Sequence, residues 1–201
     1  MQEPMYSAAV TPILKRALHT PQQSTASWPK IDSESTRTSS KNVQIVRIND
    51  IKHPAHDQRG LFAARHLPPD TFIIAYLGLI HTNADTDTDP HSNYDLSLDR
   101  ELGLSIDATA AGNEARFIND YRGIADRANA EFRDCWVQMA AVGAERARWE
   151  RRIGVFVLGA GRAGKRAAGI GVGQEVLVNY GRSFWSKRRQ AMEDEGRVQE
   201  G

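Results

Sequence analysis

The sequence predicts a mainly β domain, and three observations support this fold class. Many short apolar runs are separated by polar, glycine-containing segments, as in proteins built from short strands. Glycine is frequent, at 16 of 201 residues. No long stretch carries the apolar period of an amphipathic helix. The length of 201 residues also favours one domain with tails rather than two domains.

Composition argues against several classes of protein. The formal net charge is +1, so we expect no sequence-specific nucleic-acid binding. No apolar run approaches the roughly 20 residues of a membrane helix, and the N-terminus lacks the apolar core of a signal peptide. The one cysteine, Cys135, can form neither an internal disulfide nor a thiolate zinc cluster. We therefore expect an intracellular protein that contacts no membrane and binds no metal.

The two ends of the chain are predicted to be tails. Residues 21–40 are rich in Ser, Thr, Gln and Pro and offer little apolar surface to bury, so residues 1–42 are predicted to be disordered. A helical turn formed on a partner is the alternative for the short apolar run at residues 10–18. Residues 188–201 are charged and are predicted to be a C-terminal tail.

Between these tails, several segments are predicted to be strands because they are short, apolar and bounded by polar residues. They are residues 43–48, 71–77, 93–98, 104–108 and 153–158. Gly60 precedes another apolar run and is expected either in a β-turn or where the backbone closely approaches another group.

Two stretches do not fit the pattern of short strands. Residues 139–152 read MAAVGAERARWERR, which favours a helix or a long loop, because Ala, Glu and Arg are good helix formers. Gly159, Gly161 and Gly164 then have the spacing of a dinucleotide-binding loop. No second βαβ unit and no acidic residue in a following strand accompany them. A basic hairpin loop is therefore favoured, and a dinucleotide-binding enzyme is the alternative.

Two motifs identify a resemblance. Residues 112–123 read GNEARFINDYRG, and residues 173–181 read GQEVLVNYG. They resemble the signature and the closing motif of the SET-domain lysine methyltransferases, and the runs RGLFA, YLG and IDA match the same family in order. The resemblance covers roughly residues 45–187. It implies a SET fold of several small sheets, in which the signature threads under the loop that contains the closing tyrosine.

Compared with the family, we expect a SET domain at residues 43–187 with insertions near 138–152 and 159–169. Arg122 stands where many members have a zinc-binding cysteine, and no later cysteines follow. The chain therefore lacks recognisable pre-SET and post-SET cysteine clusters.

The resemblance also implies an activity. It predicts transfer of a methyl group from S-adenosyl-L-methionine to a lysine of a protein or peptide, with a histone tail as one candidate and the nucleus as the expected compartment. Tyr180 and Tyr94 are the expected catalytic residues, and Tyr94 and Phe184 are expected to line the substrate channel. The residues expected to bind the cofactor are Arg59, Gly60, Leu61, Arg116, Phe117, Asn119, Asp120, Tyr180 and Trp185.

Four positions depart from the family pattern: Gln58, Asp120, Ala128 and Asn179. Asp120 replaces a histidine and would place a negative charge near the positive sulfonium of the cofactor. The family contact there is largely through the backbone, so binding need not be lost. A non-catalytic SET-fold interaction module is the alternative function.

Overall fold

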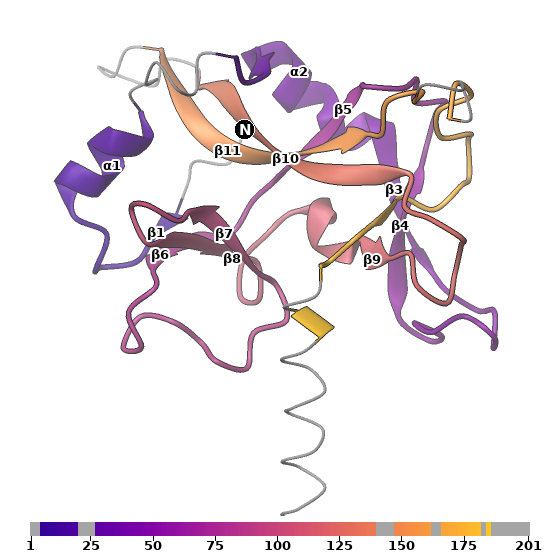
Figure 1. Cartoon of the computed structure of the whole chain (residues 1–201), viewed down its shortest axis with the longest axis horizontal. Helices are drawn as coiled ribbons and strands as arrows, with labels where there is room; N and C mark the ends of the chain where they lie inside the picture. Colours follow the sequence, from indigo (N-terminus) through magenta and orange to yellow (C-terminus); the bar gives the residue numbers. More distant parts are fainter. Residues whose placement is uncertain (1–4, 20–26, 140–146, 162–165, 182–183, 186–201) are drawn as a thin grey trace, which may run out of the picture.

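The computed structural model describes residues 5–19, 27–139, 147–161, 166–181 and 184–185. Its strands form two four-stranded sheets and two two-stranded sheets, and the helices are short (Figure 1). The predicted mainly β class is therefore confirmed. None of the helices in the described ranges is long and apolar enough to cross a membrane.

The first sheet has the order β2-β10-β11-β5. Its centre is a long antiparallel hairpin of β10 (Ala130–Met139) and β11 (Arg148–Val157), flanked by β5 (Phe72–Tyr76) and by a parallel β2 (Lys30–Ile31). The helix or loop predicted for residues 139–152 is therefore wrong at both described ends of that stretch. Pairing from Ala130↔Val157 to Met139↔Arg148 overrides the local helix propensity.

The second sheet has the order β1-β6-β8-β7. Strands β6 (Leu79–Thr82), β8 (Leu104–Asp107) and β7 (Asp95–Asp99) are antiparallel, and β1 (Met5–Tyr6) joins β6 in parallel. Its apolar side chains, such as Ile80 and Ile106, are almost completely buried in the main core.

The two small sheets bring the predicted motifs together. Strand β3 (Val43–Arg47) pairs with β4 (Arg59–Ala63), and β9 (Asn119–Asp120) pairs with β12 (Leu177–Val178). The segment 173–176 runs along the other edge of β4. Its Val176 N–H donates to the carbonyl of Leu61 at 2.7 Å. Residues 173–181, the closing segment, thus lie against β4 and then against the signature.

The N-terminal residues are ordered in the described ranges, so the predicted disorder of residues 1–42 is wrong for 5–19 and 27–42. Helix α1 (Pro12–Leu18) buries Leu18, and its cap Thr11 accepts a hydrogen bond from the Leu14 N–H. Helix α2 (Ser33–Thr38) and the 3-10 helix η2 (Ser39–Asn42) lead into β3. Their order comes from docking on the sheets, which the polar composition does not reveal. Residues 1–4, 20–26 and the predicted tail 188–201 lie outside the described ranges.

Candidate functional site

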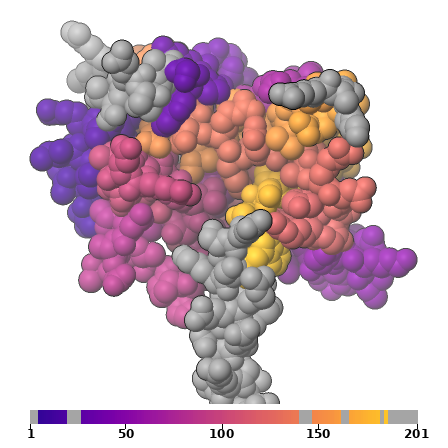
Figure 2. Space-filling view, viewed as in Figure 1, coloured from indigo at the N-terminus to yellow at the C-terminus, as the bar shows by residue number. Residues whose placement is uncertain are grey.

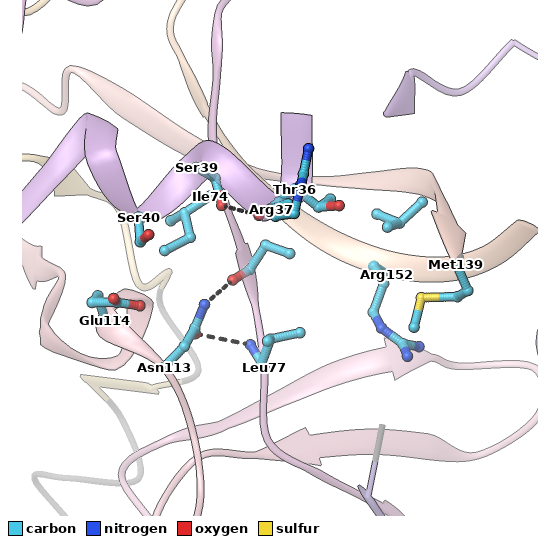
Figure 3. Close-up of a pocket in the computed structure, with 12 residues that line it drawn as sticks. Thr36, Arg37, Ser39, Ser40, Ile74, Leu77, Asn113, Glu114, Met139 and Arg152 are labelled. Carbon is cyan, nitrogen blue, oxygen red and sulfur yellow. Dashed lines mark hydrogen bonds between the residues drawn. The ribbon is translucent and has the colours of Figure 1, made fainter. Parts of the chain in front are cut away.

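The signature begins with an asparagine that attaches it to the first sheet. Asn113 Nδ2 donates to the carbonyl of Ala75 at 2.8 Å, and its Oδ1 accepts from the Leu77 N–H at 3.2 Å (Figure 3). The 3-10 helix η3 (Glu114–Phe117) follows. Ala115 within this helix and Ile118 directly after it are both buried. Sequence reasoning did not select Asn113, although it stands second in the signature.

The two residues of β9 direct their side chains to opposite sides, as in any strand. Asn119 reaches Glu175 in the closing segment, whereas Asp120 reaches Tyr180 and Trp185 beyond it. Asn129 secures the same segment, because its Nδ2 donates to the Glu175 carbonyl and its Oδ1 accepts from the Leu177 N–H, both at 2.8 Å. The signature and the closing segment are thereby joined by side chains as well as by strand pairing.

Asp120 is a buried acceptor, 6% exposed, that holds the closing segment in place. Its Oδ2 accepts from the Tyr180 N–H at 2.8 Å and from Trp185 Nε1 at 3.3 Å. Arg122 Nη1 pairs with the same oxygen at 2.8 Å, and the Arg122 N–H donates to Oδ1 at 2.9 Å. The charge that Asp120 adds is therefore balanced by Arg122.

Tyr180 and its aromatic neighbours form one wall of the candidate site. The Tyr180 hydroxyl donates to the carbonyl of Ile118 in the signature. Its ring meets Phe184 edge-on, with centroids 4.7 Å apart, and Phe184 meets Trp185 at 5.4 Å. Figure 2 shows the closing segment at the surface, in yellow, between magenta residues earlier in the chain and salmon residues near β10.

A second tyrosine lies beside Tyr180 and was not selected from the sequence. Burial raises the pKa of Tyr76, and the neighbouring Tyr180 and Asp107 raise it further. The Tyr76 hydroxyl donates to the Tyr94 carbonyl at 2.7 Å. Its position in the run YLG, which matches the family pattern, was the available signal.

Tyr94 is the most exposed aromatic side chain among the predicted site residues, at 36%. The Arg116 guanidinium lies over its ring, 4.6 Å from the centroid, and 5.7 Å from that of Phe117. Cation–π contacts of this kind orient an aromatic ring without closing its other face. Arg116 thus supports Tyr94 and also contacts the ring of Phe117.

Gly60 lies in β4, so the β-turn expected as one alternative is wrong. A Cβ on Gly60 would stand 2.5 Å from Glu175 Oε1 and 3.2 Å from Asn119 Nδ2, so no larger residue fits without displacing them. Arg59 is exposed beside it. Leu61 is completely buried, and its carbonyl accepts a hydrogen bond from the Val176 N–H. Sequence reasoning missed Glu175, which stands in the closing motif, and its partner His53.

Two further features lie apart from this cluster. A pocket of about 190 Å³ opens between α2–η2 and the first sheet, with Asn113 and Arg152 in its lining, and none of the predicted site residues lines it (Figure 3). The glycine-containing loop, for which a basic hairpin was predicted and a dinucleotide site was the alternative, lies partly outside the described residues, since 162–165 include Gly164. In its described part, Arg166 Nε donates to the Gly159 carbonyl at 2.7 Å.

The comparison with protein families decides the family. The family model of the SET domain matches residues 58–181, which contain the signature, the closing motif and the strands that join them. This chain belongs to the SET-domain family. The resemblance and the SET fold predicted from the sequence are therefore confirmed.

Solved structures agree with this fold. One described as ctPRC2 in an autoinhibited conformation bound to S-adenosylmethionine is 22% identical, with a TM-score of 0.51 over 79% of this chain and 17% of that chain. The polycomb repressive complex 2 of Chaetomium thermophilum is 23% identical, with a TM-score of 0.50 over 74% and 16%. A humanized mutant of the Chaetomium thermophilum complex bound to the inhibitor GSK343 is 22% identical, with a TM-score of 0.51 over 75% and 17%.

This SET-domain chain spans less than a fifth of the length of those chains, and at these identities the likeness concerns the fold alone. No curated protein sequence matches the chain. The family and the fold together support a SET-domain lysine methyltransferase fold.

The residues present fit the cofactor that SET domains use. Asn119 Oδ1 has no hydrogen-bond partner among the described residues, so it can accept from a ligand. The aromatic side chains of Tyr180, Phe184 and Trp185 offer a surface for a planar ring. Arg122 neutralises Asp120, so the carboxylate is not an uncompensated charge beside the site.

Proposed function

We propose that this chain is a protein-lysine N-methyltransferase that uses S-adenosyl-L-methionine. The observation that carries the proposal is the hydroxyl of Tyr180, held by the Ile118 carbonyl at the end of the signature. S-adenosyl-L-methionine, when bound, supplies a methyl group on a positive sulfur that an amine can displace in line. The protein must then align the two groups and exclude water.

Tyr180 suits this task because its hydroxyl hydrogen already forms a hydrogen bond within the protein. Because the hydroxyl donates to the Ile118 carbonyl, its oxygen can act only as an acceptor towards N–H or methyl C–H groups. Tyr76, Tyr94 and Phe184 would wall the channel, with Tyr94 held by Arg116. A channel that excludes water, together with the positive sulfonium of bound S-adenosyl-L-methionine, would favour the neutral form of a lysine, whose ordinary pKa is near ~10.4.

We propose that the remaining predicted site residues, from the signature and from outside it, hold the cofactor. Asn119 would use its side-chain carbonyl, and Trp185 would use its ring. Arg59, Gly60 and Leu61 would use their backbone, and the backbone of Asp120 would lie beside them. Arg116 would act indirectly, by supporting the Tyr94 ring, and Phe117 by contacting Arg116.

The proposed substrate is a lysine on an extended protein segment. A histone tail in the nucleus is the first substrate to test, because the family acts most often on histones and because similar structures are polycomb repressive complexes. A lysate of whole cells tests other proteins at the same time.

The test is transfer of radiolabelled methyl from S-adenosyl-L-methionine to core histones and to a cell lysate. We expect Tyr180→Phe to reduce transfer on the order of 10²-fold, or to change the number of methyl groups added, while folding survives. Tyr121→Phe is the matched control, because no hydrogen bond of the Tyr121 hydroxyl is found among the described residues. Equal rates and products in wild type and Tyr180→Phe would overturn the role of Tyr180.

Calorimetry separates this proposal from the alternative of a non-catalytic interaction module. Binding of S-adenosyl-L-methionine by the wild-type chain would exclude a module without a cofactor site. The absence of both binding and transfer would favour the module, in line with the departures at Gln58, Asp120, Ala128 and Asn179.

A further inference from the structure

A buried chain of three polar side chains crosses the candidate cofactor site. His53 comes from the loop between β3 and β4, Glu175 from the closing segment, and Asn119 from β9. His53 Nε2 lies 3.0 Å from Glu175 Oε2, and Asn119 Nδ2 lies 2.7 Å from Glu175 Oε1. The side chains of His53 and Glu175 are only 10% and 8% exposed. Gly60 makes room for this arrangement, because a Cβ there would overlap Glu175.

The direction of each hydrogen bond follows from the backbone. The Ala55 N–H donates to His53 Nδ1 at 3.0 Å, so Nδ1 is an acceptor and the proton resides on Nε2. The Nε2–H group of His53 therefore donates to Glu175. The other carboxylate oxygen accepts from Asn119 Nδ2, since a carboxylate has no proton to offer.

This directed chain fixes which end of the Asn119 amide faces the site. The NH₂ group is held by Glu175, so the carbonyl oxygen is turned away from it and is free, among the described residues, to accept. S-adenosyl-L-methionine carries N–H donors in its α-ammonium and adenine amino groups. A reversed amide would present a donor to those donors and weaken binding.

We propose that His53 and Glu175 are positioning residues that orient Asn119 to accept from an N–H group of S-adenosyl-L-methionine. This inference rests on the proposed function. Neither residue touches the reacting atoms; each acts through Asn119. The same chain ties the loop 48–58 to the closing segment, so the two sides of the proposed cofactor site are held in one geometry.

Two substitutions of His53 separate the effect of its Nε2–H donor from the effect of the size of its side chain. In His53→Gln, the side-chain amide nitrogen can take the place of Nε2 and still donate to Glu175. In His53→Asn, the nitrogen takes the place of Nδ1 and cannot reach. We expect the Kd for S-adenosyl-L-methionine to change less than about threefold in His53→Gln and to rise about tenfold in His53→Asn. His56→Asn, in the same loop and 37% exposed, is the matched control and should bind like wild type.

Glu175→Gln tests the other positioning residue. Its amide can accept from Asn119, but its NH₂ group then faces the His53 Nε2–H. Changing the tautomer of His53 would instead place an N–H against the Ala55 N–H. Reversing both the new amide and the Asn119 amide would satisfy the chain but turn the Asn119 NH₂ group towards the N–H donors of the ligand. In each arrangement one donor therefore faces another when the ligand binds, and we expect the Kd to rise about tenfold.

A double-mutant cycle shows whether His53 acts through Asn119. If it does, His53→Asn should change the Kd less than about twofold in an Asn119→Ala background, because there is no amide to orient. Equal effects of His53→Asn in both backgrounds would assign it a general structural role and overturn the inference. Unchanged Kd values in both His53→Asn and Glu175→Gln would also overturn the inference, but they would leave the proposed function intact. If wild type binds no S-adenosyl-L-methionine, the proposed function and this inference both fail.

Discussion

At the scale of single residues, two departures from the family pattern compensate one another. Asp120 alone would be a buried negative charge, and Arg122 alone would be a cation at the position where many members of the family are expected to have a cysteine. Together they form an ion pair with a 2.8 Å contact, and the carboxylate also accepts from Tyr180 and Trp185. The pair thus links the signature to the closing segment through side chains of the chain itself.

We expect Asp120→Ala to lower the free energy of unfolding by about 1–3 kcal/mol, because the Tyr180 N–H and the Trp185 indole lose their acceptor. Asp120→Asn keeps an acceptor oxygen and should lose less. Asp126→Ala, an exposed aspartate nearby, should be close to neutral. Denaturation in urea measures all three, and equal stability of Asp120→Ala and Asp126→Ala would contradict the role of Asp120.

Sequence motifs located the residues of the candidate site but not their contacts. Asn119, Asp120 and Tyr180 stand in motifs and are joined in the structure. His53 stands in no motif, and only the closeness of two distant segments shows that it bonds Glu175. Long-range side-chain pairs of this kind leave no periodic trace in a sequence.

At the scale of elements, short apolar strands were predictable and the long hairpin was not. Strands β3, β5 and β8 fall within the predicted runs because local composition and burial agree there. Strand β11 begins in a run rich in Arg and Glu, where propensity favours a helix. Its partner β10 determines its conformation, and β2 then adds to the outer edge of β10.

Docking of β2 depends on Trp28, whose ring stacks on Trp136 at 5.9 Å and lies under the Arg151 guanidinium at 4.5 Å. We expect Trp28→Ala to lower the free energy of unfolding by about 2 kcal/mol. The Trp136 N–H, which donates to the Pro29 carbonyl at 2.8 Å, should lose protection from hydrogen exchange.

Trp28→Phe keeps an aromatic ring and should retain most of that protection. The exchange rate of this single amide distinguishes local release of β2 from loss of the whole fold. Unchanged exchange at Trp136 in Trp28→Ala would show that β2 docks without the ring.

At the scale of the whole molecule, the N-terminal segment joins both large sheets. Strand β1 extends the second sheet, and β2 extends the first. A buried polar cluster connects them: Glu150 on β11 is completely buried and lies 3.1 Å from His19 Nε2 and 2.9 Å from Arg152 Nη2. The Tyr6 hydroxyl donates to the same carboxylate at 2.5 Å. The polar composition of this segment predicted disorder. It could not reveal these contacts, because the partners are far apart in the sequence.

This cluster should make the stability of the domain depend on pH in the acid range. Burial alone raises the pKa of Glu150, but the hydrogen bond from His19, the charge of Arg152 and the Tyr6 hydroxyl outweigh it and lower the pKa from 4.5 to about 2. Stability from this group is therefore present above pH 4.5 and lost as the pH falls towards 2. The lowering of the Glu150 pKa from 4.5 to about 2 corresponds to about 3 kcal/mol of folding stability.

Glu150→Gln removes this dependence and leaves Arg152, 2% exposed, without its carboxylate. We expect the variant to be about 3–5 kcal/mol less stable than wild type at neutral pH. This difference in the free energy of unfolding should narrow by about 3 kcal/mol as the pH falls from 4.5 towards 2, because the Glu150 carboxylate of wild type is then protonated and loses its charge. Glu101→Gln, an exposed control, should follow wild type throughout. Urea denaturation at several pH values measures the gap, and a gap that stays constant would show that Glu150 does not carry the acid dependence of the fold.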